Sequence, residues 1–289
     1  MKQTSSSMQG KVCLVTGSNS GIGKATALGL AKLGATVVMI CRDQSKGQAA
    51  QDEIKAKSGN SSVDLLIADL SSQQSIRHLA QEVKTRYPQV HVLLNNAGVS
   101  AGKRTVTVDG LETTFAVNHL APFLLTNLLL DHLKASAPAR IVTVASMAQN
   151  AIRFDDLQSE QRYNAWEVYG QSKLANILFT YELARRLEGT GVTANCLHPG
   201  VVATNLARDM SPVFQAFIRV LSISRVLFTS PEKGAETSIY LASSPEVEGI
   251  SGKYFSNKRV AQPQPAAADT TNAQRLWQVS EQLTQLVPA

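Results

Sequence analysis

Short apolar runs alternate with helical patterns along most of this chain, and this alternation restricts the folds that it can adopt. The runs are rich in β-branched residues, mostly lack strict apolar and polar alternation, and cover residues 11–16, 36–41, 63–68, 90–95, 140–145 and 192–197. Strands that are apolar along their whole length are typical of a parallel sheet covered by helices on both faces. The sequence therefore predicts an α/β fold with a doubly wound parallel sheet of about seven strands.

Helical patterns fill the intervals between the apolar runs. We expect helices over residues 23–33, 75–87 and 115–134, the first of them ended by Gly34 as a C-terminal glycine. No internal repeat or low-complexity linker interrupts the alternation. We therefore predict a disordered segment over residues 1–7, a single domain over residues 8–257, and a tail over residues 258–289 with a helix over 272–286.

Composition narrows the classes of protein that fit the chain. Hydrophobic residues make up 44 % and charged residues 17 %, which is typical of a globular protein. The net charge of +6 is spread along the chain, which argues against a nucleic-acid partner but leaves attraction to an anionic cofactor or a membrane surface open. The three cysteines, Cys13, Cys41 and Cys196, lack the spacing of a metal site or a disulfide framework. With a polar N-terminal segment, we expect a soluble cytoplasmic protein without a transmembrane segment or a bound metal.

A glycine-rich turn directly follows the first apolar run. Gly17 permits a tight turn, Gly21 lets the backbone approach a pyrophosphate, and Gly23 lets helix and strand pack closely. The N-terminus of the following helix favours phosphate charge. The spacing differs from the Gly-x-Gly-x-x-Gly dinucleotide fingerprint, so a purely structural turn is the alternative. The candidate cofactor contacts in this turn are Gly17, Ser18, Asn19, Ser20, Gly21, Ile22 and Gly23.

The residues after the second and third apolar runs bear on which cofactor is bound. An arginine after the second strand can accommodate the 2′-phosphate of NADP, whereas an acidic residue there binds the ribose 2′-hydroxyl of NAD. Arg42 stands at this position and favours NADP. Asp43 keeps NAD as an alternative, or caps the next helix. Asp69 is a candidate for the adenine edge, with a helix cap as its alternative.

Tyr169 and Lys173 lie four residues apart, so a helix places the phenol and the ammonium on the same face. A nearby cation lowers the pKa of a phenol toward the range useful for acid and base catalysis. Two further candidates precede them: Asn118, an asparagine in a helical pattern, and Ser146, which ends the fifth apolar run. The alternatives are a satisfied buried amide for Asn118 and an ordinary turn residue for Ser146.

In their order and approximate spacing, these motifs resemble those of the short-chain dehydrogenase/reductase family over residues 8–257. The matching positions are Thr16, Gly17, Gly21, Ile22, Gly23, Asp69, Leu70, Asn95, Asn96, Ala97, Gly98, Asn118, Ser146, Tyr169, Lys173, Pro199 and Gly200. Within the family the chain is most similar to the retinol dehydrogenase group, for example through Cys41-Arg42-Asp43 and Leu197-His198-Pro199-Gly200. The resemblance implies a Rossmann-type fold.

The resemblance also implies hydride transfer between the nicotinamide of NADP, or less favourably NAD, and an alcohol or carbonyl carbon. Its implied catalytic residues are Asn118, Ser146, Tyr169 and Lys173. Besides the glycine turn, the implied cofactor contacts are Arg42, Asp69, Leu70, Asn95, Ala97, Gly98, Tyr169, Lys173, Pro199, Gly200, Val202 and Thr204. It further implies a homo-oligomer, as a dimer or tetramer.

The apolar segment 206–230 is predicted to form a lid over a small apolar substrate, such as a retinoid, a lipid aldehyde or a sterol. A pair of core helices, or a peripheral contact with a membrane surface, is the alternative for this segment. Two other functions stay open at this point: a light-dependent protochlorophyllide reductase-like enzyme, and a catalytically silent NADP(H)-binding sensor.

Overall fold

The computed structural model describes residues 7–200 and 229–286, which form one eight-stranded sheet with helices on both faces. The sheet has the strand order β3-β2-β1-β4-β5-β6-β7-β8, and only the short strand β8 runs antiparallel to its neighbour. The strands are β1 (Val12–Thr16), β2 (Thr36–Cys41), β3 (Val63–Ile67), β4 (Val92–Asn95), β5 (Ala139–Val144), β6 (Val192–His198), β7 (Tyr254–Ser256) and β8 (Arg259–Val260). The predicted doubly wound α/β fold is confirmed.

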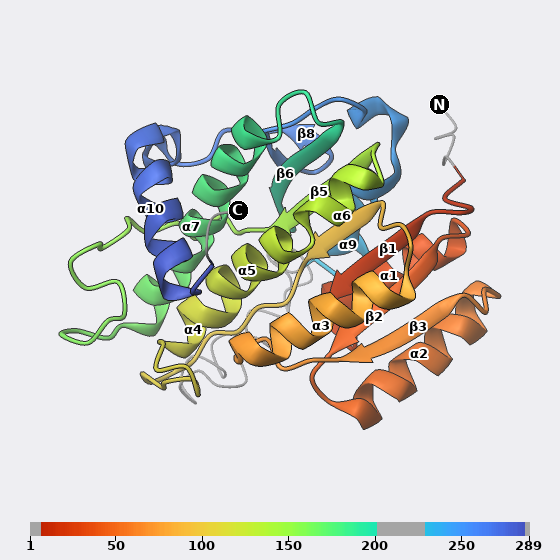
Figure 1. Ribbon diagram of the computed structural model, residues 1–289, viewed down its shortest axis with the longest axis horizontal. Helices are drawn as coiled ribbons and strands as arrows, with labels where there is room; N and C mark the ends of the chain where they lie inside the picture. Colours follow the sequence, from red (N-terminus) through yellow and green to blue (C-terminus); the bar gives the residue numbers. More distant parts are fainter. Residues whose placement is uncertain (1–6, 201–228, 287–289) are drawn as a thin grey trace.

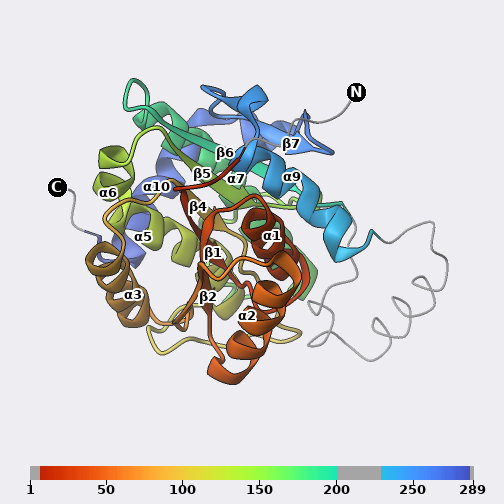
Figure 2. The same ribbon diagram turned by 90° about the vertical axis from the view of Figure 1, so that its right-hand side faces the viewer.

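The helices form two layers that enclose the sheet. Figure 2 shows α1, α2 and α9 on one side of the sheet and α3, α5 and α6 on the other. The helices are α1 (Gly21–Lys32), α2 (Gln44–Ser58), α3 (Gln73–Arg86), α4 (Thr113–Phe115), α5 (Ala121–Leu128), α6 (Leu130–Ala135), α7 (Ala165–Arg186), α9 (Pro231–Ser243) and α10 (Thr270–Leu283). Shorter helical turns are η1 (Ala116–Leu120), η3 (Pro245–Val247) and η4 (Pro265–Ala268). The order of the strands reverses beside β1, so β1 and β4 flank the switch point at which such sheets bind ligands.

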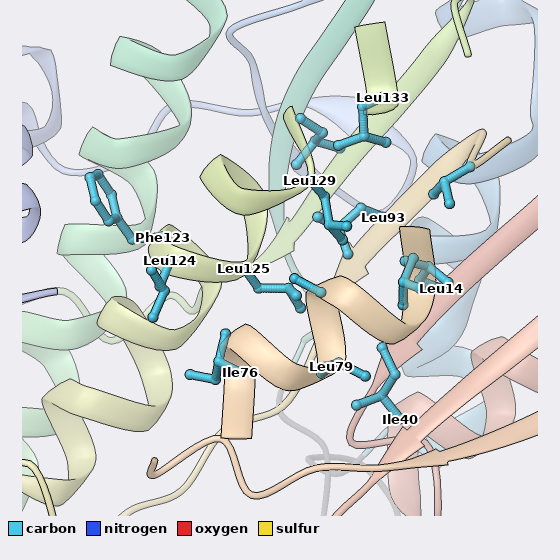
Figure 3. Close-up of a cluster of buried hydrophobic side chains, with 14 of the residues drawn as sticks. Leu14, Ile40, Ile76, Leu79, Leu93, Phe123, Leu124, Leu125, Leu129 and Leu133 are labelled. Atoms are coloured by element: carbon cyan, nitrogen blue, oxygen red, sulfur yellow. The ribbon is translucent and has the colours of Figure 1, made fainter. Parts of the chain in front are cut away.

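The strands are apolar along their length because both faces of the sheet are buried. Leu14 of β1 and Ile40 of β2 pack with α3 and α5, as Figure 3 shows. Their neighbours Val15 and Met39 enter the opposite core, beneath α1 and α2. Successive side chains of a strand point to opposite faces, so an apolar residue is needed at every position.

The predicted helix over residues 115–134 is wrong as a continuous element. The structure divides it into α4, the π-helical turn η1, α5 and α6, with a break at Leu129 between the last two. The π-helical turn contains Asn118 and lies fully buried between other elements. Tertiary packing has therefore overridden a continuous local pattern.

Helix α7, between β5 and β6, and the C-terminal helix α10 complete the fold. Helix α7 starts at Ala165, where the Asn164 side chain caps it by accepting hydrogen bonds from the amides of Trp166 and Glu167. The predicted tail helix is present as α10, which lies alongside α7 (Figure 1). Residues 201–228, which hold most of the predicted lid, and residues 1–6 of the predicted disordered segment lie outside the described residues.

Among the helices that the structure describes, none has an apolar stretch long enough to cross a membrane.

Candidate active site

The glycine turn after β1 is anchored to the loop that follows β4. The Asn96 side-chain amide donates to the Thr16 carbonyl at 2.8 Å, and the amides of Asn96 and Ala97 donate to Thr16 Oγ1 at 2.9 and 3.0 Å. Gly17 has a φ of +66°, a left-handed conformation that favours glycine. A Cβ at Gly23 would collide with the Gly17 carbonyl and the Asn96 amide. The turn is therefore held in a fixed shape by the loop that follows β4.

The N-terminus of α1 has the features of an anion site. Ser20 caps the helix without a side-chain hydrogen bond, and the first turn carries no acidic residue. The free amides and the helix dipole at this end therefore favour a negatively charged group. The glycine turn supplies the rest of the backbone around such a negatively charged group.

The end of β2 lies against the same turn. The Gly17 amide donates to the Ile40 carbonyl at 2.9 Å, and Ser18 Oγ lies 3.6 Å from Cys41 Sγ. The next residue, Arg42, is exposed and makes no hydrogen bond or ion pair with the described residues. Asp43 caps α2, because its side chain accepts a hydrogen bond from the Lys46 amide at 2.9 Å. Of the two roles predicted for Asp43, binding of NAD and capping of a helix, the structure shows the cap.

The predicted cofactor residues after β3 and β4 have different environments. Asp69 accepts hydrogen bonds from the amide and hydroxyl of Ser71, and Ser72 is the residue that caps α3, so the helix-cap alternative for Asp69 is wrong. Leu70 is partly buried against the core. The Asn95 side chain is 2 % exposed and donates to Thr126 of α5 at 3.1 Å, away from the glycine turn. Any cofactor contact of Asn95 would therefore involve its backbone.

Ser146, Tyr169 and Lys173 come together at the carboxyl end of β5. Burial raises the pKa of Tyr169 to about 12, and the neighbouring Ser146 side chain lowers this pKa by a smaller amount. Lys173 Nζ lies 5.5 Å from the Tyr169 ring centroid and donates to the Val144 carbonyl at 3.0 Å. Burial lowers the pKa of Lys173 to about 8.

These values differ from the sequence-based expectation, in which Lys173 lowers the pKa of Tyr169. The ammonium faces the ring and a carbonyl, while removal of the phenol from water disfavours the phenolate. At neutral pH Tyr169 is therefore a protonated phenol. It is poised to donate a proton.

Ser146 is held in place by a residue far along the chain. Tyr254 of β7 donates to the Ser146 carbonyl at 3.1 Å, and the Gln149 side chain donates to the same carbonyl at 3.0 Å. The Ala148 amide donates to Ser146 Oγ at 3.1 Å. These contacts fix the turn after β5.

Asn118 is a fully buried amide that joins the loop after β4 to α7. Its Oδ1 accepts from the Val99 amide at 2.7 Å, and its Nδ2 donates to the Val99 carbonyl and to Ser172 Oγ, each at 2.9 Å. A Cβ at Gly98 would lie 3.4 Å from both Asn118 Oδ1 and Lys173 Nζ. The predicted catalytic residues therefore meet the predicted cofactor loop at Gly98.

Pro199 and Gly200 follow β6 and are partly exposed, and the Gly200 amide donates to His198 Nδ1 at 3.2 Å. Val202 and Thr204 lie outside the described residues.

Sequence reasoning assigned no supporting role to three residues that hold the site together: Thr16, Ser172 and Tyr254. The first two lie inside recognised motifs, where their polar side chains beside glycine or tyrosine were the available signal. Tyr254 carries no such signal, because it lies 108 residues from its partner Ser146.

The chain is similar to known proteins over nearly its whole length. A family model described as short chain dehydrogenase matches residues 11–213. Retinol dehydrogenase 14 of Homo sapiens is 48 % identical, over 97 % of this chain and 88 % of that protein.

Solved structures agree with this relationship. A putative uncharacterized protein from Mycobacterium paratuberculosis matches with a TM-score of 0.78 and 36 % identity, over 98 % of this chain and 96 % of that one. The Pseudomonas aeruginosa RhlG/NADP active-site complex matches with a TM-score of 0.70 and 29 % identity, over 86 % of this chain and 95 % of that one.

The parallel sheet, the anchored glycine turn and the Ser146, Tyr169 and Lys173 cluster define an NAD(P)-dependent oxidoreductase of the Rossmann type. The chain belongs to the short-chain dehydrogenase family, and it is similar to the retinol dehydrogenases within it.

Proposed function

We propose that this chain is an NADP(H)-dependent oxidoreductase that interconverts an alcohol and a carbonyl group on an apolar substrate. The observation that carries this proposal is the meeting of Ser146, Tyr169 and Lys173 at the end of β5. The cluster lies beside the loop that anchors the glycine turn. Proton chemistry and a nucleotide site thus share one edge of the sheet.

The residues fit a nicotinamide dinucleotide, because the glycine turn and the start of α1 offer backbone amides without a competing carboxylate. When bound there, NADPH would supply a hydride to the carbonyl carbon. Tyr169 donates its proton to the carbonyl oxygen, and Ser146 donates a hydrogen bond to the same oxygen. Lys173 provides a positive charge close to Tyr169 when it is protonated, which stabilises the phenolate left after the transfer.

Arg42 and Asp43 support NADP over NAD. The Arg42 guanidinium has no partner among the described residues and follows the strand end that touches Ser18. The Asp43 carboxylate is engaged by the Lys46 amide and lies 3.5 Å from the Lys46 ammonium. A free guanidinium beside the turn suits a 2′-phosphate, whereas the engaged carboxylate is less available to a 2′-hydroxyl. The matched RhlG structure is itself an NADP complex.

Two exposed apolar side chains support an apolar substrate. Met147 follows Ser146 directly and is 56 % exposed. Trp166 is 53 % exposed, and its ring centroid lies 6.4 Å from that of Tyr169. Large apolar groups left open to water beside a reactive phenol can bury an apolar substrate. The name of the 48 % identical relative, retinol dehydrogenase 14, points to retinoids as substrates to test.

The proposed function is tested with a homologous series of aliphatic aldehydes, retinal and NADPH, by following the absorbance of NADPH. We expect kcat/KM to rise with aldehyde chain length. In the Trp166→Ser variant, kcat/KM for the longest aldehydes should fall about tenfold while that for the shortest changes by less than about twofold, because only the longer chains bury the indole.

Val108→Ser is the matched control, since Val108 is 85 % exposed and lies outside the site. Absence of turnover with every carbonyl would contradict the proposed function. An equal loss on short and long aldehydes would contradict the role of Trp166.

Binding of NADPH is expected to take up a proton above pH 8 through Lys173. The pKa of Lys173 in the free protein is lowered to about 8, so its ammonium loses the proton as the pH rises through this value. A ribose hydroxyl that accepts a hydrogen bond from the ammonium favours the charged form and raises the pKa. Proton uptake should therefore be negligible at pH 6.5 and approach about one proton near pH 9.

Calorimetric titrations in buffers of different ionisation enthalpy measure this uptake. Lys173→Gln is the control, and its binding should show no uptake at either pH. Equal uptake by the wild-type protein and by Lys173→Gln at pH 9 would rule out Lys173 as the group responsible.

A further inference from the structure

The C-terminal helix α10 packs against the helices that carry the active site. Its Trp277 ring lies 4.9 Å from the Phe123 ring of α5 and 5.8 Å from the Phe179 ring of α7, measured between centroids. The Arg186 guanidinium covers the same indole at 4.1 Å. Figure 1 shows α10 running beside α7. The helix is thus an integral part of the core.

A buried polar contact joins α10 to the π-helical turn η1. His119 of η1 is fully buried, and its Nε2 lies 2.9 Å from Ser280 Oγ of α10. Its Nδ1 lies 3.4 Å from Asn176 Oδ1 of α7. Burial lowers the pKa of His119 to about 4, so the ring is neutral and uses one nitrogen as donor and the other as acceptor. Loss of either partner would leave a buried ring nitrogen unsatisfied.

The residue before His119 is Asn118, the amide that bridges Val99 and Ser172. Ser172 in turn donates to the Tyr169 carbonyl at 2.7 Å. Asn118 and His119 are consecutive residues of the same π-helical turn, so a backbone shift that moves His119 also moves Asn118. The position of the Asn118 amide therefore depends on how His119 is held.

We propose that Ser280 and His119 are positioning residues, which hold the π-helical turn so that the Asn118 amide bridges the cofactor loop and α7. The sequence separation of 161 residues between Ser280 and His119 makes α10 a remote support of the active site. This inference rests on the proposed function for its kinetic consequence, because Asn118, Tyr169 and Lys173 matter to turnover only if the chain is the proposed oxidoreductase.

The structural consequence is measured first, without reference to activity. The Val99 amide donates to Asn118 Oδ1, so its hydrogen exchange reports whether Asn118 is in place. In Ser280→Ala this exchange should be at least about fivefold faster than in the wild-type protein. Thr284→Val is the matched control, because the Thr284 hydroxyl is equally buried and donates within α10 to the Ser280 carbonyl at 2.6 Å. It should leave Val99 exchange unchanged.

The kinetic consequence is measured on the same variants, well below their unfolding temperatures. Ser280→Ala should lower kcat about fivefold with the KM for NADPH unchanged, and Thr284→Val should keep the wild-type kcat. His119→Gln, which retains a donor and an acceptor, should keep kcat closer to wild type than His119→Leu.

Equal Val99 exchange in Ser280→Ala and Thr284→Val would overturn the positioning role. Absence of turnover by the wild-type protein would instead count against the proposed function, and the exchange experiment would still decide whether Ser280 positions Asn118.

Discussion

Replacing Tyr169 by phenylalanine is expected to lower kcat by about 10²- to 10⁴-fold, the range found when a general acid is removed. The Tyr169 phenol lies against the Ser146 side chain at the end of β5, whereas the Tyr254 phenol contacts the Ser146 carbonyl, and burial keeps the Tyr169 phenol protonated at neutral pH. Phenylalanine preserves the ring against which Trp166 and Lys173 lie, so the loss should fall on proton transfer. Stopped-flow and steady-state measurements of NADPH oxidation give the change in kcat.

The control for this prediction is Tyr87→Phe. The Tyr87 hydroxyl donates to Asp64 at 2.8 Å, away from the site, so its loss affects stability but not kcat. The dissociation constant of NADPH, measured by fluorescence titration, should change by less than about threefold in Tyr169→Phe. Turnover in Tyr169→Phe within about tenfold of wild type would remove Tyr169 from the role of proton donor.

Replacing Arg42 by alanine is expected to raise the KM for NADPH about 30-fold while leaving the KM for NADH within about twofold. The guanidinium is exposed, has no partner among the described residues, and follows the strand end beside the glycine turn. Two charge-assisted hydrogen bonds to a 2′-phosphate account for a loss of this size, and NADH offers no such group. Initial rates with both cofactors give the two KM values.

Lys57→Ala is the matched control for Arg42→Ala. It removes the same charge from the far end of α2, where Lys57 pairs with Glu53 at 2.8 Å, so it tests for a general electrostatic effect. If Arg42→Ala raised the KM for NADPH and NADH equally, Arg42 would have no part in selecting the cofactor.

The sheet could be predicted from the sequence because each strand carries its own signal. In β2, for example, the side chains alternate between the two faces of the sheet and are buried on both, at Val37, Val38, Met39 and Ile40. The run is therefore apolar throughout, which predicts a strand in a sheet covered by helices on both faces. The broken helix after β4 could not be predicted. Its π-helical turn is packed against elements that are distant in the sequence, such as Ser280 at a separation of 161 residues from His119, and such contacts leave no local pattern.

The site likewise combines features that the sequence predicts with features that only the folded structure determines. The Tyr-x-x-x-Lys spacing and the family resemblance grouped Ser146, Tyr169 and Lys173 into one predicted site, and the structure brings these residues together. The predicted direction of the Tyr169 pKa shift was wrong, since the pKa is raised by burial, which depends on the packed structure. The support that Tyr254 gives Ser146 likewise exists only in the folded chain.

The most direct test of this account follows the hydride itself. The protein is incubated with NADPH in which both C4 hydrogens of the nicotinamide are replaced by deuterium and with the aldehyde that it turns over best, and the product is analysed by mass spectrometry. The account predicts an alcohol with one deuterium on its carbinol carbon, formed by the wild-type protein and reduced with Tyr169→Phe in proportion to kcat. An alcohol without deuterium, or equal deuterated product from Tyr169→Phe at equal times, would contradict it.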